Sequence, residues 1–113
     1  FVWKGWVDNI YSFFNQIDLL IIPSKYDSCP NLLLEGLNSN KMMFASNIAA
    51  HKEIIKNKEL IFSINNIDLL VKKIIKLKKS KKYQNKIKST VLNTRKKNQF
   101  NWDKNFYRLI KKC

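Results

Sequence analysis

The chain of 113 residues is long enough for one domain with a modest hydrophobic core and short for a complete two-domain enzyme that uses a nucleotide. Its 22 lysines and arginines outnumber 8 acidic residues and give a formal net charge of +14, which points toward nucleic acid or an anionic membrane as a partner. Almost all the cations are lysines, however, and lysine, asparagine and isoleucine share A/T-rich codons. Base composition alone could explain much of this charge, so the charge does not decide the function.

Cysteine usage and hydropathy exclude two further classes of protein. Cys29 and Cys113 lie far apart and only His51 could join them, so we expect neither a disulfide framework nor a metal site. The longest apolar run, 19–22, is far shorter than the roughly 20 residues that cross a bilayer, so any membrane contact is expected to be peripheral. These features fit a cytoplasmic location, and the protein could lie against the inner face of the membrane.

In chain order, the first predicted elements are a strand, a short helix and a second strand. Residues 1–6 alternate and contain β-formers up to Gly5, which predicts the end of a strand followed by a turn. Asp8 is expected to cap a helix in which apolar residues recur at helical spacing within 10–17. The continuous apolar run 19–22 is typical of a strand that is buried on both faces of a parallel sheet.

Pro30 is expected in the first turn of the next helix, because its missing N–H costs nothing there. Further strands are predicted at 42–45 and 60–64, and further helices at 49–55, from Asn66 onward, at 81–97 and at 102–112. Strands that alternate with helices indicate an α/β fold. We therefore predict a Rossmann-like parallel sheet with flanking helices and a helical C-terminal tail. Residues 1–65 would form its ligand-binding part, and residues 66–113 the Lys-rich helices of the same domain.

Two carboxylates, Asp27 and Glu35, bracket the segment with the most chemical content. Asp27 lies in a loop after a buried strand and Glu35 lies on the helix after that loop, an arrangement that α/β proteins use to hold phosphorylated ligands. At about 1.5 Å of helix per residue, the carboxylates are expected on the order of 10 Å apart, which is wide beside the pair of a retaining glycosidase at about 5 Å. This spacing suits the two ends of one extended ligand.

The helix after Pro30 has a polar and an apolar side. Steps of about 100° per residue place Asn31, Glu35 and Asn38 on one side and Leu33, Leu34 and Leu37 on the other. The first amides, around Asn31 and Leu32, are free donors for a phosphate or a sugar hydroxyl. The residues alone also allow a simpler interpretation, in which Asp27 caps the helix and Glu35 is merely solvated.

The order of short motifs between residues 18 and 55 resembles one known family. The motifs are, in order, Asp18, the apolar run, Pro23-Ser24, Tyr26, the acidic Asp27, Pro30-Asn31, Leu33-Leu34-Glu35, a short strand, Ser46-Asn47-Ile48 and Glu53-Ile54-Ile55. Over about residues 1–62 this pattern resembles the C-terminal domain of group 1 (family 4) retaining glycosyltransferases of the GT-B fold. The segment 100–102 is similar to the aromatic element before that family's last helix.

The resemblance implies a role for each residue that matches the family's motifs. Glu35 matches a glutamate that accepts hydrogen bonds from the donor ribose. Asp27 matches the catalytic position beside the donor sugar, although its side chain is one methylene shorter than the family's glutamate. Gly5 matches a glycine near the nucleobase. Backbone amides of the intervening segment would contact the sugar and the diphosphate, and its residues are Ser28, Cys29, Pro30, Asn31 and Leu32.

The resemblance implies that the chain is the nucleotide-sugar-binding part of a hexosyltransferase-type enzyme. Such an enzyme transfers a sugar to a glycan or lipid-linked acceptor, as in polysaccharide biosynthesis. The resemblance implies no metal or other cofactor. The sequence at Phe1 is typical of the middle of a domain, so we expect the chain to be a fragment. In the whole enzyme, the acceptor domain and the basic residues that neutralise the donor diphosphate would come before it. Catalysis of such a reaction depends mainly on stabilising the nucleoside diphosphate that leaves, so residues 1–113 alone are expected to be inactive. The chain departs from the family at Gly36, where alanine is usual, and at Asn40, where glycine is usual.

Other interpretations stay open. The chain could be a non-catalytic remnant, or a basic module that binds nucleic acid or a membrane surface. The Lys-rich helices could be solvated, could dock on anionic lipid or could bind RNA. Nucleic acid is not expected, because an RNP signature and a GxxG loop are absent and arginine is scarce. His51 is expected at the surface, and Trp3, Trp6 and Trp102 in the core or an interface.

Overall fold

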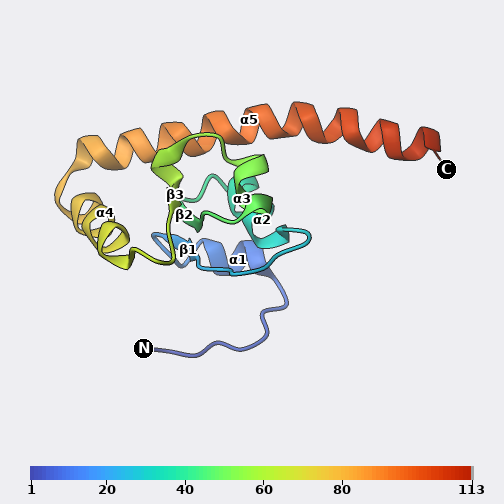
Figure 1. The fold of residues 1–113 in the computed structure, drawn as a ribbon. Helices are drawn as coiled ribbons and strands as arrows, with labels where there is room; N and C mark the ends of the chain where they lie inside the picture. The colour runs from blue at the N-terminus through green and yellow to red at the C-terminus, as the bar shows by residue number, and fades with distance from the viewer. Residues whose placement is uncertain (113) are drawn as a thin grey trace.

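The computed structural model describes the backbone of residues 1–112 and the side chains of residues 1–98. The elements are, in chain order, α1 (Ile10–Phe14), β1 (Leu20–Ile22), α2 (Asn31–Asn38), β2 (Met43–Ser46), α3 (Ala49–Ile54), the 3-10 helix η1 (Lys58–Leu60), β3 (Ile61–Phe62), α4 (Ile67–Lys79) and α5 (Lys81–Lys112). Figure 1 shows the strands near the centre of the molecule and the long α5 along one side. Strands alternate with helices up to Phe62 and helices follow, as predicted.

Within residues 1–112 the sheet has three parallel strands in the order β1-β2-β3. Leu20 pairs with Met43, and Ala45 pairs with Ile61, so β2 lies between the other two strands. All four residues of β2 are buried. Burial of a whole strand is the pattern of a parallel sheet covered on both faces. The predicted Rossmann-like α/β fold is therefore confirmed.

β1 is buried on one face only, and the prediction of two buried faces was wrong. Leu20 and Ile22 are buried, whereas Ile21 between them is 36% exposed. Successive side chains of a strand point to opposite faces, so Ile21 lies on the face that Leu20 and Ile22 do not share. β1 pairs with β2 alone among the described residues and forms an edge of the sheet, where less of the chain covers it.

The predicted strand at residues 1–6 does not form. A strand needs a neighbour that accepts and donates its backbone hydrogen bonds, and no strand within residues 1–112 pairs with this segment. Trp3 and Trp6 are 83% and 89% exposed, so they do not belong to the core. Trp102 lies outside the residues whose side chains are described.

The cap of α1 is Asn9 and not Asp8. The Asn9 side chain accepts a 3.1 Å hydrogen bond from the amide of Ser12. Asp8 instead accepts a 3.0 Å hydrogen bond from Nε1 of Trp6. An N-cap side chain has to reach an amide two or three positions ahead, and Asn9 is the residue at that distance from Ser12.

Gly36 lets α2 approach the sheet closely. A Cβ atom on this glycine would lie 2.7 Å from Cδ2 of Leu20 and 2.8 Å from Cε of Met43. The side chains of β1 and β2 therefore fill the space that an alanine at position 36 would need. The glycine at position 36, where the family usually has alanine, leaves room for the side chains of Leu20 and Met43.

Asn40 ends α2 in the conformation that glycine usually supplies. Its φ angle is +53°, in the left-handed region. The amide of Asn40 donates to the carbonyl of Leu37, and the amide of Lys41 donates to the carbonyl of Gly36. These two bonds form a Schellman motif, in which asparagine is the commonest substitute for glycine. Nη1 of Arg95 on α5 also donates a 2.9 Å hydrogen bond to Oδ1 of Asn40.

The C-terminal part contains two helices where the sequence predicted three. α4 matches the helix predicted from Asn66 onward, whereas the predicted helices 81–97 and 102–112 are one continuous helix, α5. Neither glycine nor proline occurs between residues 97 and 102, so the chain has no strong helix breaker there. The predicted aromatic element at 100–102 lies outside the described side chains. Among the described residues, no helix has the length and the apolar composition to cross a membrane.

A polar cluster fastens α4 and α5 to the end of the sheet. Tyr83 Oη donates a 3.1 Å hydrogen bond to Oε2 of Glu59, and Lys86 forms a 3.2 Å ion pair with Oε1 of the same carboxylate. Nζ of Lys73 donates to the carbonyls of Glu59 and Ile61 at 2.9 and 3.1 Å. Helices α4 and α5 are thus joined to η1 and β3 by side chains as well as by apolar packing.

The cluster shifts the titration of its own members. Partial burial alone would raise the pKa of Glu59, but the hydrogen bonds from Lys86 and Tyr83 and the charges of Lys86 and Lys73 lower it. Burial, the negative charge of Glu59 and the hydrogen bond to it raise the pKa of Tyr83 to about 12. Desolvation lowers the pKa of Lys73.

Candidate functional site

Asp27 closes a turn in the loop between β1 and α2. Its Oδ1 atom accepts a 3.1 Å hydrogen bond from the amide of Cys29, which is an Asx-turn. Sγ of Cys29 lies 3.2 Å from Oδ1 of Asn31 and donates to it. Asp27 is half-buried, whereas Ser28 and Cys29 are exposed. The bond from Asp27 goes to the loop and not to the first turn of α2, so Asp27 is not the cap of this helix.

The first turn of α2 presents free backbone donors. Pro30 occupies the N-cap position, one residue before the predicted place, and no side chain caps the helix. The amide of Asn31 donates to the carbonyl of Cys29 at 2.8 Å. The amides of Leu32 and Leu33 have no backbone acceptor among the described residues. Free amides and the positive end of the helix dipole together favour an anion or a hydroxyl oxygen at this position.

Glu35 lies one turn further along the polar side of α2. Its side chain is half-buried, while Asn31 and Asn38 on the same side are exposed. Leu33 and Leu37, on the opposite side, are fully buried at 0% and 1% exposure. This division of polar and apolar sides is the one that the helical spacing predicted. The described residues form no ion pair with Glu35, so both oxygens of the carboxylate can accept hydrogen bonds from a ligand.

A buried pair of side chains joins the loop of Asp27 to the turn after β2. Oγ of Ser46, the last residue of β2, donates a 2.6 Å hydrogen bond to the carbonyl of Ser24, at the start of the loop. Nδ1 of His51 lies 2.9 Å from the carbonyl of Ser46 and 3.2 Å from its Oγ. The carbonyl can only accept, so Nδ1 carries the proton of this hydrogen bond. Both loops follow the carboxyl ends of their strands, where parallel α/β sheets bind ligands.

The prediction of a surface position for His51 was wrong. His51 is fully buried, and its Nε2 atom has no hydrogen-bond partner among the described residues. His51 on α3 and Ile55, four residues later and directly after the helix, are both buried in the core. This spacing, together with the serine at the end of β2, was the signal in the sequence that could have identified His51 as a buried partner of the loop.

Gly5 is not brought to the other predicted site residues. It lies in the exposed segment before α1 and has a φ angle of +63°, which glycine adopts freely. The side-chain hydrogen bonds of residues 1–9 are local: Trp6 donates to Asp8, and Asn9 accepts from the amide of Ser12. Within the described residues, no hydrogen bond connects this segment to the loop that contains Asp27.

A comparison with models of protein families identifies the family of this chain. The family model described as glycosyl transferases group 1 matches residues 1–94. The chain belongs to this family of group 1 glycosyltransferases. The comparisons with curated proteins and with solved structures gave no significant match. The matched residues contain the Asp27 loop, α2 and the β2–α3 turn, and they extend through α4 into α5, beyond the resemblance seen in the sequence.

The described part of this glycosyltransferase domain contains no cluster of metal-ligating side chains. Among the described side chains, no three of His, Cys, Asp or Glu lie close enough together to hold a metal ion. Asp27 and Glu35 stay the two residues that the sequence predicts at the ends of one ligand. Their separation of about 10 Å, derived from the helical rise, stays a prediction.

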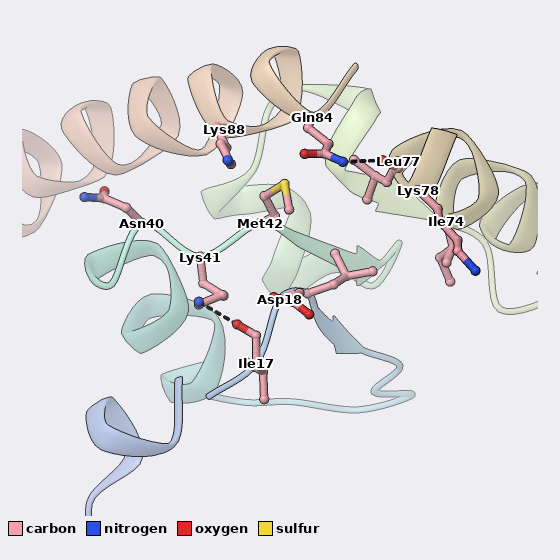
Figure 2. A pocket seen from close by; sticks show the side chains of 11 residues that line it. Ile17, Asp18, Asn40, Lys41, Met42, Ile74, Leu77, Lys78, Gln84 and Lys88 are labelled. Atoms are coloured by element: carbon pink, nitrogen blue, oxygen red, sulfur yellow. Dashed lines mark hydrogen bonds between the residues drawn. The ribbon is translucent and has the colours of Figure 1, made fainter. Parts of the chain in front are cut away.

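A cavity of about 550 Å³ lies at the opposite edge of the sheet. Leu19 and Met42, which directly precede β1 and β2, line it, so it opens at the amino ends of the strands. Figure 2 shows this cavity between α4, α5 and the segment before β2, with Nζ of Lys41 hydrogen-bonded to the carbonyl of Ile17. The cavity is separate from the Asp27 loop and from the first turn of α2, none of whose residues line it.

Proposed function

We propose that this chain is the donor-binding part of a GT-B glycosyltransferase and that it holds a nucleotide diphosphate sugar at the carboxyl edge of its sheet. The observation that supports this most directly is the position of Glu35. It is a half-buried carboxylate without an ion-pair partner among the described residues, one turn from the free amides of Leu32 and Leu33. In a member of the group 1 family, this arrangement fits a ribose beside a diphosphate.

Each part of the donor has a candidate partner. The two oxygens of Glu35 would accept hydrogen bonds from the vicinal hydroxyls of the ribose. Amides of the segment 28–32 would donate to the diphosphate and the sugar, with the helix dipole adding to the attraction. Asp27, held by the amide of Cys29, would stand beside the sugar at the catalytic position. Gly5 is the predicted partner of the nucleobase, but it lies in the exposed segment before α1 and would have to approach from there.

The reaction we propose is transfer of a hexose from the donor to a glycan or lipid-linked acceptor, as in polysaccharide biosynthesis. Departure of the nucleoside diphosphate requires positive charge next to the phosphates. Lys25 is the only basic residue between Pro23 and Glu35, so the loop itself carries little of this charge. We therefore expect residues 1–113 alone to bind the donor without measurable transfer of the sugar.

Saturation-transfer NMR on the chain of residues 1–113 tests donor binding. UDP, GDP and ADP sugars are compared with the free sugars and with the nucleoside monophosphates. We expect saturation of ribose and sugar protons for at least one nucleotide sugar, and weaker signals for the free sugar. Equal, weak signals for every compound would show that the chain has no donor site and would favour the non-catalytic remnant.

A further inference from the structure

The outer side of α4 carries an apolar stripe that nothing within the described residues covers. Ile67, Val71 and Ile75 are 48%, 45% and 46% exposed. They recur every four residues, so they lie along one side of the helix. Leu70 and Leu77, on the other side, are buried in the core. We call the three exposed residues the α4 stripe.

Lysines lie beside the α4 stripe. Helix α4 contains five lysines and one acidic residue, Asp68. The exposed lysines of the helix are Lys72, Lys76, Lys78 and Lys79. At about 100° per residue, Lys78 projects in nearly the same direction as Ile67 and Val71, and the other three lie to one side of the stripe. An aliphatic stripe with lysines beside it is the composition of a helix that lies in the interface of an anionic membrane.

The cavity at the amino edge of the sheet adjoins this surface. Ile74, Leu77 and Lys78 line it from α4, and Lys88 lines it from α5. In Figure 2 the ammonium group of Lys88 extends from α5 into the space above the segment before β2. Asp18 supplies the one carboxylate among the lining residues. The lining lysines therefore outnumber the acid, and there is room for a phosphate group next to the α4 stripe.

We propose that the α4 stripe and its lysines dock this domain on a membrane that contains anionic lipid, with Lys78 and Lys88 next to the phosphate of a lipid headgroup. The net charge of +14 complements such a surface. The same observations fit RNA less well. The exposed apolar side chains of α4 are aliphatic, whereas RNA-binding surfaces stack bases on aromatic rings and use arginine. This proposal is independent of donor binding at the opposite edge of the sheet.

Vesicle flotation with residues 1–113 tests the proposal. Vesicles of phosphatidylcholine alone are compared with vesicles that contain equal parts of phosphatidylglycerol. The substitution of both Val71→Ser and Ile75→Ser should weaken binding to the anionic vesicles about tenfold or more, because the apolar contact is lost. Val2→Ser, in the segment before α1 where Val2 is 75% exposed, is the matched control and should bind like the wild type. Circular dichroism of each variant verifies that it is folded.

The same experiment tests the contribution of the lysines and the source of the phosphate group that they contact. The variant with both Lys78→Ala and Lys88→Ala should bind anionic vesicles several-fold more weakly and phosphatidylcholine unchanged. Failure of the wild type to float with anionic vesicles at low salt would overturn the proposal, as would equal binding by the stripe variant. Tighter binding of a random RNA, unaffected by the stripe substitutions, would identify a nucleic-acid surface instead. Equally tight binding of free glycerol phosphate would identify a soluble phosphate ligand and would also contradict the proposal.

Discussion

Oγ of Ser46 donates a 2.6 Å hydrogen bond to the main-chain carbonyl of Ser24, which ties the end of β2 to the start of the loop that contains Asp27. His51 contacts the same serine from α3, and both Ser46 and His51 are fully buried. A partly buried hydrogen bond between the end of a strand and a loop restrains both, because breaking it would leave polar atoms without partners. The position of the Asp27 loop therefore depends on residues that do not belong to the loop.

Ser46→Ala tests this dependence. The substitution leaves the carbonyl of Ser24 without its donor, so we expect the free energy of unfolding to fall by about 1–3 kcal/mol. Urea denaturation followed by circular dichroism measures the change. Ser12→Ala is the matched control, because Ser12 is exposed on α1, and it should change stability by less than about 0.5 kcal/mol. Equal effects of the two substitutions would show that the hydrogen bond between Ser46 and Ser24 contributes nothing.

Gly36→Ala tests the close contact between α2 and the sheet. Alanine gains up to about 1 kcal/mol of helix propensity, whereas overpacking against Leu20 and Met43 costs about 1–3 kcal/mol. We expect a net loss of about 1 kcal/mol in the free energy of unfolding. The added change Met43→Leu removes the Cε atom from this contact, so the loss should be smaller in the Met43→Leu background. Strict additivity in this double-mutant cycle would mean that the two residues do not interact.

Tyr83 provides a prediction about pH. Its pKa is raised to about 12, mainly by burial and then by Glu59, above the ordinary value of about 10 in the unfolded chain. The native state therefore holds this proton more tightly, so the stabilisation is complete below about pH 10 and is lost as the pH rises through 12. The difference in tyrosinate absorbance between the wild type and Tyr83→Phe isolates the titration of Tyr83, and its midpoint should lie near pH 12. Glu59→Gln should lower this midpoint, and a midpoint near 10 in the wild type would refute the assignment.

Much of the fold was predictable because local patterns and tertiary packing agree. The apolar run at 19–22 and the leucines of α2 become β1 and the buried side of that helix, because periodicity and burial point in the same direction. Residues 1–6 show the opposite case. Their alternation satisfies the local pattern of a strand, but a strand also needs a partner, and the described residues provide none.

The candidate site was predictable in part. The turn at Asp27 and the polar side of α2 follow from residues that are close in sequence. The contact between Ser24 and Ser46 joins positions 22 residues apart, and local spacing does not reveal such a bond. His51 was placed at the surface because its contact with Ser46 is a tertiary one, although the spacing of His51 and Ile55 was compatible with burial.

The central claim is that Glu35 binds the ribose of a nucleotide sugar, and isothermal titration calorimetry tests it most directly. The Kd for the nucleotide sugar with the strongest NMR signal is measured with wild type, Glu35→Ala and the control Asn38→Ala, an exposed residue on the same side of α2. Loss of hydrogen bonds to a carboxylate should raise the Kd about tenfold or more for Glu35→Ala. Asn38→Ala should leave the Kd nearly unchanged. Equal Kd values for wild type and Glu35→Ala, with both proteins folded, would contradict the account.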